Sequence, residues 1–148
     1  MLMNDIAVVG GGTMGTGIAY VAAQAGCHVT VVEPNERTAE SMQGSLSDAA
    51  KNGLARGRLD RESATALLKR IDHVYDVGDI ALGMDLVIET VPERVDTKLD
   101  VLRKIAKRQP SFIATNTSAL SIDELSEAVA HPDRFLGMHF FNPVWSIK

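Results

Sequence analysis

One stretch near the start decides the fold of this chain: Asp5-Ile6-Ala7-Val8-Val9-Gly10-Gly11-Gly12-Thr13-Met14-Gly15-Thr16-Gly17-Ile18-Ala19. Its apolar run, residues 6–9, predicts a buried strand, and residues 16–25 predict a helix. Between them Gly10, Gly12 and Gly15 keep GxGxxG spacing. The first glycine permits a sharp turn, the second lets the backbone approach a pyrophosphate, and the third lets the helix pack closely on the strand. We therefore predict that free N–H groups at the helix N-terminus bind a phosphate anion.

A second apolar run, residues 28–32, ends in Glu33, eighteen positions after Gly15. In a dinucleotide-binding fold, an acid at this place accepts the hydroxyls of the adenosine ribose and disfavours a 2′-phosphate. This pattern favours NAD over NADP, although Arg37, four positions later, could weaken the preference. The candidate cofactor-binding residues here are Gly10, Gly11, Gly12, Thr13, Met14, Gly15 and Glu33. The alternative is an ordinary glycine turn followed by a solvated glutamate.

Length and composition limit the class of protein. The 148 residues suit one domain, and the fractions of 45% hydrophobic and 23% charged residues are typical of globular proteins. A net charge of −4 makes a nucleic acid or an anionic membrane an unexpected partner. Cys27 is the single cysteine, so no intrachain disulfide can form, and no residue spacing suggests a metal site. Because the first predicted strand begins close to Met1, we expect no signal peptide and a cytoplasmic location.

Strands and helices alternate along the rest of the chain. We predict further strands at residues 71–76, 85–90, 112–115 and 134–141, and helices at 34–53, 60–69, 92–107 and 121–129. This order predicts the α/β class, with a doubly wound Rossmann-type parallel sheet. The helices 34–53 and 60–69 form an inserted helical pair after the second strand, because a minimal crossover needs one helix. Ligands bind such sheets at the carboxyl ends of the strands. Six polar residues should meet there: Glu33, Glu93, Asn116, Ser118, His139 and Asn142.

Four segments carry a family resemblance that covers essentially the whole chain: VGGGTMG at 9–15, IETVPE at 88–93, TNTSAL at 115–120 and GMHFFNPV at 137–144. They resemble the short-chain L-3-hydroxyacyl-CoA dehydrogenases, including the bacterial 3-hydroxybutyryl-CoA enzymes. Relatives that act on hydroxy acids without CoA tend to have an HPFNPP-like final motif. The pair Phe140-Phe141 therefore indicates the CoA-ester branch.

The resemblance implies NAD-dependent interconversion of L-3-hydroxyacyl-CoA and 3-oxoacyl-CoA, in fatty acid β-oxidation or butanoate metabolism. His139 would be the general base that takes the hydroxyl proton while hydride passes from C3 to the nicotinamide. Imidazole suits this role because its ordinary pKa, about 6.5, lies near neutrality. Ser118 and Asn142 would hydrogen-bond the substrate oxygen and the nicotinamide side of the cofactor.

The same resemblance places Glu93 and Lys98 near the cofactor. Ser45 and Lys51, in the inserted helical pair, are looser candidates for binding the CoA end of the substrate. Each assignment has an alternative from the residues alone. His139 could be a structural histidine, Ser118 could complete a turn, Asn142 could simply precede a proline, and Lys98 could be a solvated helix residue.

The resemblance also implies how the chain is organised. Residues 1–148 would form an NAD-binding Rossmann domain truncated at its C-terminal end, without the helical domain that completes the acyl-CoA pocket and forms the dimer in relatives. A glutamate that orients the catalytic histidine in relatives would fall beyond Lys148. Trp145 and Ile147 also depart from the family pattern.

These observations leave three hypotheses for function. The chain is the cofactor-binding part of an acyl-CoA dehydrogenase of this kind, a non-catalytic dinucleotide-binding module, or a dehydrogenase of a related hydroxy acid without CoA. In the first case we expect an acyl-CoA substrate, and a homo-oligomer where the C-terminal domain is present.

Overall fold

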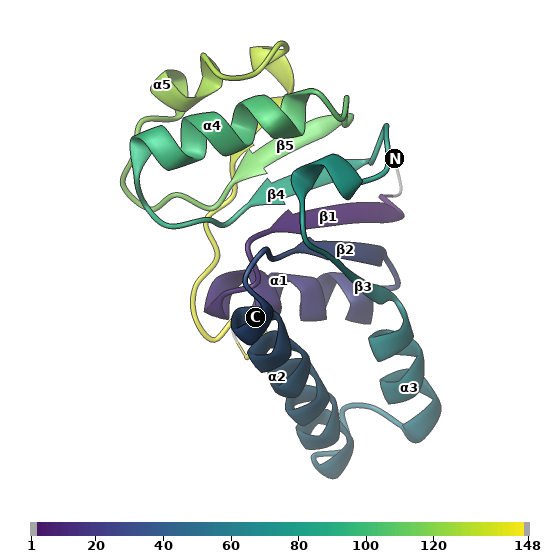
Figure 1. Cartoon of the computed structure of the whole chain (residues 1–148). Helices are drawn as coiled ribbons and strands as arrows, with labels where there is room; N and C mark the ends of the chain where they lie inside the picture. The colour runs from purple at the N-terminus through teal and green to yellow at the C-terminus, as the bar shows by residue number, and fades with distance from the viewer. Residues whose placement is uncertain (1–2, 147–148) are drawn as a thin grey trace.

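The computed structural model describes residues 3–146 (Figure 1). Ile147 and Lys148 lie outside the described residues. The elements follow in this order: β1 (Asp5–Val9), α1 (Thr13–Gln24), β2 (His28–Val32), α2 (Glu36–Ala55), α3 (Arg61–Lys69), β3 (Ile71–Val74), the 3-10 turn η1 (Val77–Asp79), β4 (Leu86–Glu89), α4 (Val95–Ala106), β5 (Phe112–Thr115), α5 (Ile122–Ser126), the 3-10 turn η2 (Pro132–Arg134) and β6 (Phe135–Gly137).

The six strands form one parallel sheet in the order β3-β2-β1-β4-β5-β6. The central strand β1 pairs with β2 on one side and with β4 on the other, with Val8 opposite both Val31 and Ile88. The strand order therefore reverses at β1. In parallel sheets this reversal opens a crevice at the carboxyl ends of the strands, where ligands bind. The predicted doubly wound parallel sheet is confirmed.

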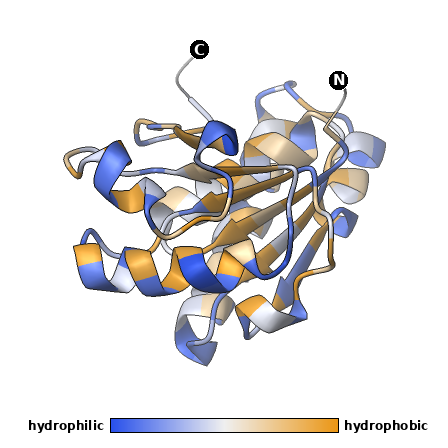
Figure 2. Cartoon of the chain, turned by 90° about the horizontal axis from the view of Figure 1, so that it is seen from above, coloured by the Kyte–Doolittle hydropathy of each residue, from blue (hydrophilic) through white to orange (hydrophobic). Residues whose placement is uncertain are grey.

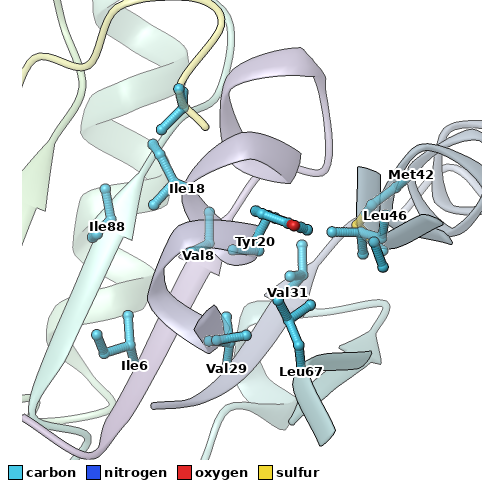
Figure 3. Packing of buried hydrophobic residues seen from close by; sticks show 14 of the residues in the cluster. Ile6, Val8, Ile18, Tyr20, Val29, Val31, Met42, Leu46, Leu67 and Ile88 are labelled. Carbon is cyan, nitrogen blue, oxygen red and sulfur yellow. The ribbon is translucent and has the colours of Figure 1, made fainter. Parts of the chain in front are cut away.

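Helices cover both faces of the sheet, and each face has its own hydrophobic core. Ile6 and Val8 pack into the core under α1, whereas Ala7 and Val9 pack into the core under α4. Figure 3 shows Ile18 of α1 on the side of the sheet where Ile6 and Val8 are buried. Figure 2 shows the apolar strands enclosed by helices whose outer sides are polar. Burial on both faces explains why β1 is a continuous apolar run and not an alternating one.

The predicted helical pair after β2 is present as α2 and α3, which extend away from the sheet in Figure 1. Asn35 caps α2 by accepting from the N–H of Thr38 at 3.0 Å, and Asp60 caps α3 by accepting from the N–H of Ser63 at 2.7 Å. Only a narrow stripe of α2 is buried, as its sparse apolar pattern predicts.

The last strand is shorter than predicted. We expected a strand over 134–141, but β6 ends at Gly137. Its neighbour β5 ends at Thr115, whose carbonyl accepts from the N–H of Met138 at 2.9 Å, so no strand continues alongside the later residues. The N–H of Phe140 is bound instead by the side-chain oxygen of Asn116 at 2.8 Å. Residues 138–146 consequently form a loop.

This loop crosses the carboxyl end of the sheet. In Figure 1 it descends from β6 toward α1. Val144 is buried in the core under α1, and Trp145 meets Tyr20 of α1 edge to face, with ring centroids 5.9 Å apart. The two ends of the loop are thus fixed on opposite sides of the crevice. Within residues 3–146, no helix has the length and apolar character needed to cross a membrane.

Candidate functional site

The glycine-rich turn leaves room for a ligand at the N-terminus of α1. Gly10 has φ +112°, and a Cβ there would lie 2.8 Å from the Thr90 hydroxyl oxygen. A Cβ on Gly15 would lie 1.8 Å from the carbonyl oxygen of Gly10, so only glycine permits this packing. By contrast, a Cβ on Gly12 would meet nothing within 4 Å. Gly12 is also the N-cap of α1 and provides no side chain to bind the first N–H groups. This open cradle fits a pyrophosphate.

Glu33 lies at the end of β2, beside the glycine-rich turn. Its carboxylate accepts from the N–H of Gly11 and from the N–H of Asn35, each at 2.9 Å. The ring of His73 donates to the Glu33 backbone carbonyl at 2.9 Å. Because a carboxylate offers about four lone-pair sites, the two bonds leave acceptor capacity for hydroxyl groups. Glu33 therefore fits the predicted role of binding a ribose diol.

A cavity of about 730 Å³ opens between these two features. Its size is within the range of small-molecule binding sites. Its wall is formed by the glycine-rich turn, the end of β2, the segment after β4 and one face of α4, including Gly10, Gly12, Thr13, Met14, Glu33, Thr90, Val91, Thr97 and Lys104. Arg37 is exposed and does not line this cavity. The feature that could favour a 2′-phosphate is therefore not part of the cavity wall.

A second cavity, of about 250 Å³, lies on the other side of the reversal point. It shares Met14, Thr90 and Val91 with the larger cavity, so the two are adjacent. The residues that line it are Met14, Thr90, Val91, Glu93, Lys98, Asn116, Ser118, His139 and Phe140. The structure thus brings together five predicted site residues from four separate segments: Met14, Glu93, Lys98, Ser118 and His139. A cofactor with its ribose at Glu33 and its pyrophosphate at Gly12 would place its nicotinamide end here.

His139 stands at the rim of the smaller cavity. It is exposed, and its ring lies 4.6 Å from that of Phe141. The backbone on both sides of His139 is fixed at the end of β5. The Met138 N–H donates to the Thr115 carbonyl, and the Phe140 N–H donates to the Asn116 side chain. Asn142 is exposed on the same loop but does not line this cavity. Its role at the nicotinamide therefore stays a prediction.

Lys98 is buried in a network that links α4 to β4 and β5. Only 1% of its side chain is exposed, and its Nζ donates to Glu89 at 2.7 Å and to the Val91 carbonyl at 3.2 Å. Glu93 Oε2 lies 3.2 Å from the same Nζ. The alternative of a solvated helix lysine is therefore wrong. The buried charge of this lysine is tolerated because two carboxylates pair with its ammonium.

Glu93 is the carboxylate of this network that lines the cavity. Its carboxylate accepts from the Thr117 hydroxyl and from the N–H of Ser118 at 3.1 Å. Burial acts to raise the pKa of Glu93, but the hydrogen bonds from Thr117 and Lys98 and the charge of Lys98 together hold the pKa below its usual value. Glu93 is therefore ionised at neutral pH and fixes the turn that carries Ser118.

Sequence reasoning did not select Glu89. It is fully buried at the end of β4, where it accepts from the Thr115 hydroxyl at 2.6 Å and from the N–H of Val91 at 2.7 Å. One signal could have identified it. A single carboxylate follows the apolar run 86–88, where the strand ends, and a buried carboxylate requires a partner.

The predicted CoA-binding residues lie elsewhere. Ser45 lines a third cavity, of about 390 Å³, between α1 and α2, together with Arg56, Arg58 and Trp145. Lys51 does not line it. Its ammonium pairs with Asp48 at 3.5 Å, and both side chains are 73% exposed. The two arginines were not selected from the sequence, although they stand in the predicted loop between the paired helices. Within residues 3–146, no group of histidine, cysteine or acidic side chains could hold a metal ion.

Comparison with known proteins decides the family. A family model described as "3-hydroxyacyl-CoA dehydrogenase, NAD binding domain" matches residues 5–148. The chain belongs to this family. Membership in the 3-hydroxyacyl-CoA dehydrogenase family confirms the resemblance predicted from the four segments, and the NAD-binding domain confirms the predicted cofactor.

Relatives in the 3-hydroxyacyl-CoA dehydrogenase family match nearly the whole chain. The mitochondrial hydroxyacyl-coenzyme A dehydrogenase of Sus scrofa is 34% identical over 155 residues, which cover 100% of this chain and 49% of the relative. The 3-hydroxyadipyl-CoA dehydrogenase of Escherichia coli is 35% identical over 152 residues, covering 100% of this chain and 32% of the relative. The chain thus spans about half the length, or less, of the curated relatives it matches.

Solved structures of family members have the same fold. The 3-hydroxybutyryl-CoA dehydrogenase of Escherichia coli superposes with a TM-score of 0.94 at 33% identity, covering 100% of this chain and 32% of that one. The (S)-3-hydroxybutyryl-CoA dehydrogenase of Ralstonia eutropha gives a TM-score of 0.92 at 31% identity, covering 99% of this chain and 52% of that one. The Rossmann-type domain described above is therefore the family's domain.

Proposed function

We propose that this chain is the cofactor-binding part of an NAD-dependent oxidoreductase that interconverts L-3-hydroxyacyl-CoA and 3-oxoacyl-CoA. One observation carries the proposal. The cavity that contains His139, Ser118 and Glu93 adjoins the cavity at the glycine-rich turn, with Met14, Thr90 and Val91 in both walls. The proposed proton acceptor would thus stand beside the proposed cofactor site. The names of the relatives support the substrate class.

Each residue has a part that its position allows. The N–H groups at the start of α1 and the open space at Gly12 would hold the pyrophosphate, and the Glu33 carboxylate would accept the ribose hydroxyls. When bound, NAD would accept a hydride at its nicotinamide. His139 would hold the hydroxyl proton of the substrate at a ring nitrogen, and the Ser118 hydroxyl would bind the same substrate oxygen. Asn142 would contact the nicotinamide side.

We place the CoA end of the substrate at the third cavity. Ser45 would contact it there, and the guanidinium groups of Arg56 and Arg58 supply the positive charge that phosphates require. Lys51 remains a candidate from the neighbouring helix surface. Because the side chain of Lys51 is 73% exposed, it can leave Asp48 without a large cost.

The test is NADH oxidation by this chain with acetoacetyl-CoA, with NADH binding followed by fluorescence in the same sample. We expect NADH to bind, and turnover to fall far more than binding in His139→Ala. His131→Ala is the matched control, because His131 is exposed beside η2 and lines neither cavity of the crevice. Turnover that survives in His139→Ala would show that the base lies elsewhere.

The same experiment separates the other hypotheses. Binding without any turnover would identify a non-catalytic dinucleotide-binding module, or a domain that needs further chain to act. Turnover with hydroxy acids such as a gulonate or carnitine, and none with the CoA ester, would identify the branch without CoA.

We also propose a cytoplasmic location and, where a C-terminal domain is present, a homo-oligomer. The unpaired thiol of Cys27 is compatible with a reducing compartment. The exposed ring of Phe141, next to the crevice, offers apolar surface for a further domain or subunit. A relative named as the alpha subunit of a fatty acid oxidation complex matches 96% of this chain at 37% identity. Cell fractionation and light scattering would test the two proposals.

A further inference from the structure

A buried carboxylate in the site has no assigned purpose. Glu89 is 0% exposed and lines neither cavity of the crevice. Its two oxygens are occupied by the Val91 N–H, the Thr115 hydroxyl and the Lys98 ammonium. Placing a charged group at the end of a buried strand is unfavourable unless it is paired. The pairing with Lys98 explains how the buried charge of Glu89 is tolerated. The same pairing also affects the charge that the neighbouring cavity presents to a ligand.

The charges around Lys98 do not cancel. Two carboxylates, Glu89 and Glu93, surround one ammonium, which leaves one negative charge in the cluster. Lys98 lies closer to Glu89, at 2.7 Å, than to Glu93, at 3.2 Å. The first pair is sealed from solvent, with side chains 1% and 0% exposed, whereas the Glu93 side chain is 38% exposed. The net negative charge of the cluster is therefore presented to the cavity at Glu93, the carboxylate that lines it.

Besides Lys98, no lysine or arginine within residues 3–146 lines this cavity to offset the charge. Its titratable lining residues are Glu93, Lys98 and His139. Lys98 is already paired with Glu89, and His139 is exposed to solvent. The nicotinamide ring carries a positive charge in the oxidised cofactor and none in the reduced cofactor. A negative cavity consequently treats the two forms differently.

We propose that Glu89 cancels the charge of Lys98, so that Glu93 presents a net negative charge to the nicotinamide and raises affinity for oxidised cofactor relative to reduced cofactor. Glu93 acts on the ring directly, and Glu89 is a positioning residue that acts through Lys98. The inference rests on the proposed function in one respect only, that the chain binds NAD with its nicotinamide in the smaller cavity.

The test compares dissociation constants for the two cofactor forms, with NADH followed by fluorescence and NAD⁺ by competition with NADH. In Glu93→Gln we expect the ratio Kd(NAD⁺)/Kd(NADH) to rise about fivefold to tenfold, the order of magnitude for losing one unit charge from a partly solvated site. In Glu89→Gln we expect a rise in the same direction, because Lys98 then neutralises Glu93. The ratio, unlike either constant alone, is insensitive to packing losses common to both forms.

The matched control is Glu62→Gln. Glu62 is an exposed acid in the first turn of α3 and lines a separate cavity with Gln24, at the far end of α1. This change removes the same charge from the protein, and we expect the ratio to stay constant. A ratio that rises as much as in Glu93→Gln would mean that net charge alone is responsible and would overturn the proposal.

The outcomes separate the two proposals. If neither cofactor form binds the unaltered chain, the proposed function fails. If both bind and Glu93→Gln leaves the ratio unchanged, the charge inference is overturned while the proposed function stands. If Glu93→Gln raises the ratio and a folded Glu89→Gln does not, the role given to Glu89 is refuted. Thermal unfolding by circular dichroism checks folding, and where Glu89→Gln does not fold, Glu93→Gln decides.

Discussion

Replacing Lys98 by methionine should destabilise the fold much more than a surface change of the same kind. Methionine keeps the apolar stem but removes the ammonium, which leaves Glu89 buried at 0% exposure without its counter-charge. Breaking a buried ion pair in this way costs about 3–5 kcal/mol. Glu89 keeps its bonds from Val91 and Thr115, and the half-exposed Glu93 can turn to water, so we expect about 3 kcal/mol, at the lower end of that range.

The assay is urea unfolding, with the free energy of unfolding extrapolated to water. For a domain of this size, about 3 kcal/mol corresponds to a melting temperature roughly 6–12 °C lower. Lys51→Met is the matched control, because Lys51 also pairs with an acid, Asp48, but on the surface. We expect that variant to lose less than about 1 kcal/mol.

A double variant completes the test. Lys98→Met combined with Glu89→Gln removes both charges, and the amide can still accept from Val91 or Thr115. We expect it to regain most of the stability that Lys98→Met loses, since replacing both members of a buried pair is often nearly neutral. The reasoning is refuted if Lys98→Met loses no more than Lys51→Met, or if the double variant loses the sum of the two single changes.

Three further predictions concern the crevice. Gly12→Asp should fold, because a Cβ there meets nothing within 4 Å. It should nevertheless abolish NADH binding, measured by fluorescence, because it places a negative charge against the pyrophosphate. Gly15→Ala, whose Cβ would lie 1.8 Å from a carbonyl oxygen, should instead destabilise the fold. Glu33→Ala should raise the affinity for NADPH relative to NADH, and an unchanged ratio of the two dissociation constants would remove Glu33 from the ribose site. Because the pKa of Glu93 is lowered in the folded state, its contribution to stability is present above its unfolded pKa and is lost as pH falls through the folded pKa. Urea unfolding of Glu93→Gln below about pH 4.3 should therefore show a weaker dependence on pH than the unaltered chain, and equal slopes would contradict the lowered pKa.

The sheet and its first crossover were predictable because their signals are local. The run at residues 6–9 is apolar at every position, as a strand buried on both faces must be, and β1 contacts both cores. The side chains of Asp60 and Ser121 each accept a hydrogen bond from the backbone N–H three residues later. Capping of these two helix N-termini could therefore be predicted from residue spacing alone. The predicted ends of the strands and helices were less accurate. The predicted strand to residue 141 ends at Gly137, because the length of an edge strand depends on the neighbour beside it.

The candidate site was predictable in its residue types but not in its contacts. The family motifs identified His139, Ser118, Glu93 and Lys98, and the structure places all four around one cavity. The burial of Lys98 could not be predicted, because its partner Glu89 precedes it on a different element. The separation of Lys51 from the cavity that Ser45 lines likewise depends on how α2 faces α1.

The sequence by itself determined the order of strands and helices, the glycine-rich turn and the acid that follows β2. These features depend on apolar periodicity and on steric limits at single glycines, both of which act over a few residues. Only the tertiary structure decided that the turn after β5 and the loop after β6 meet at the end of β4, and that one lysine is enclosed by two glutamates. Parallel pairing brings distant strand ends to one edge, and the charge of a group acts on whatever packing places beside it.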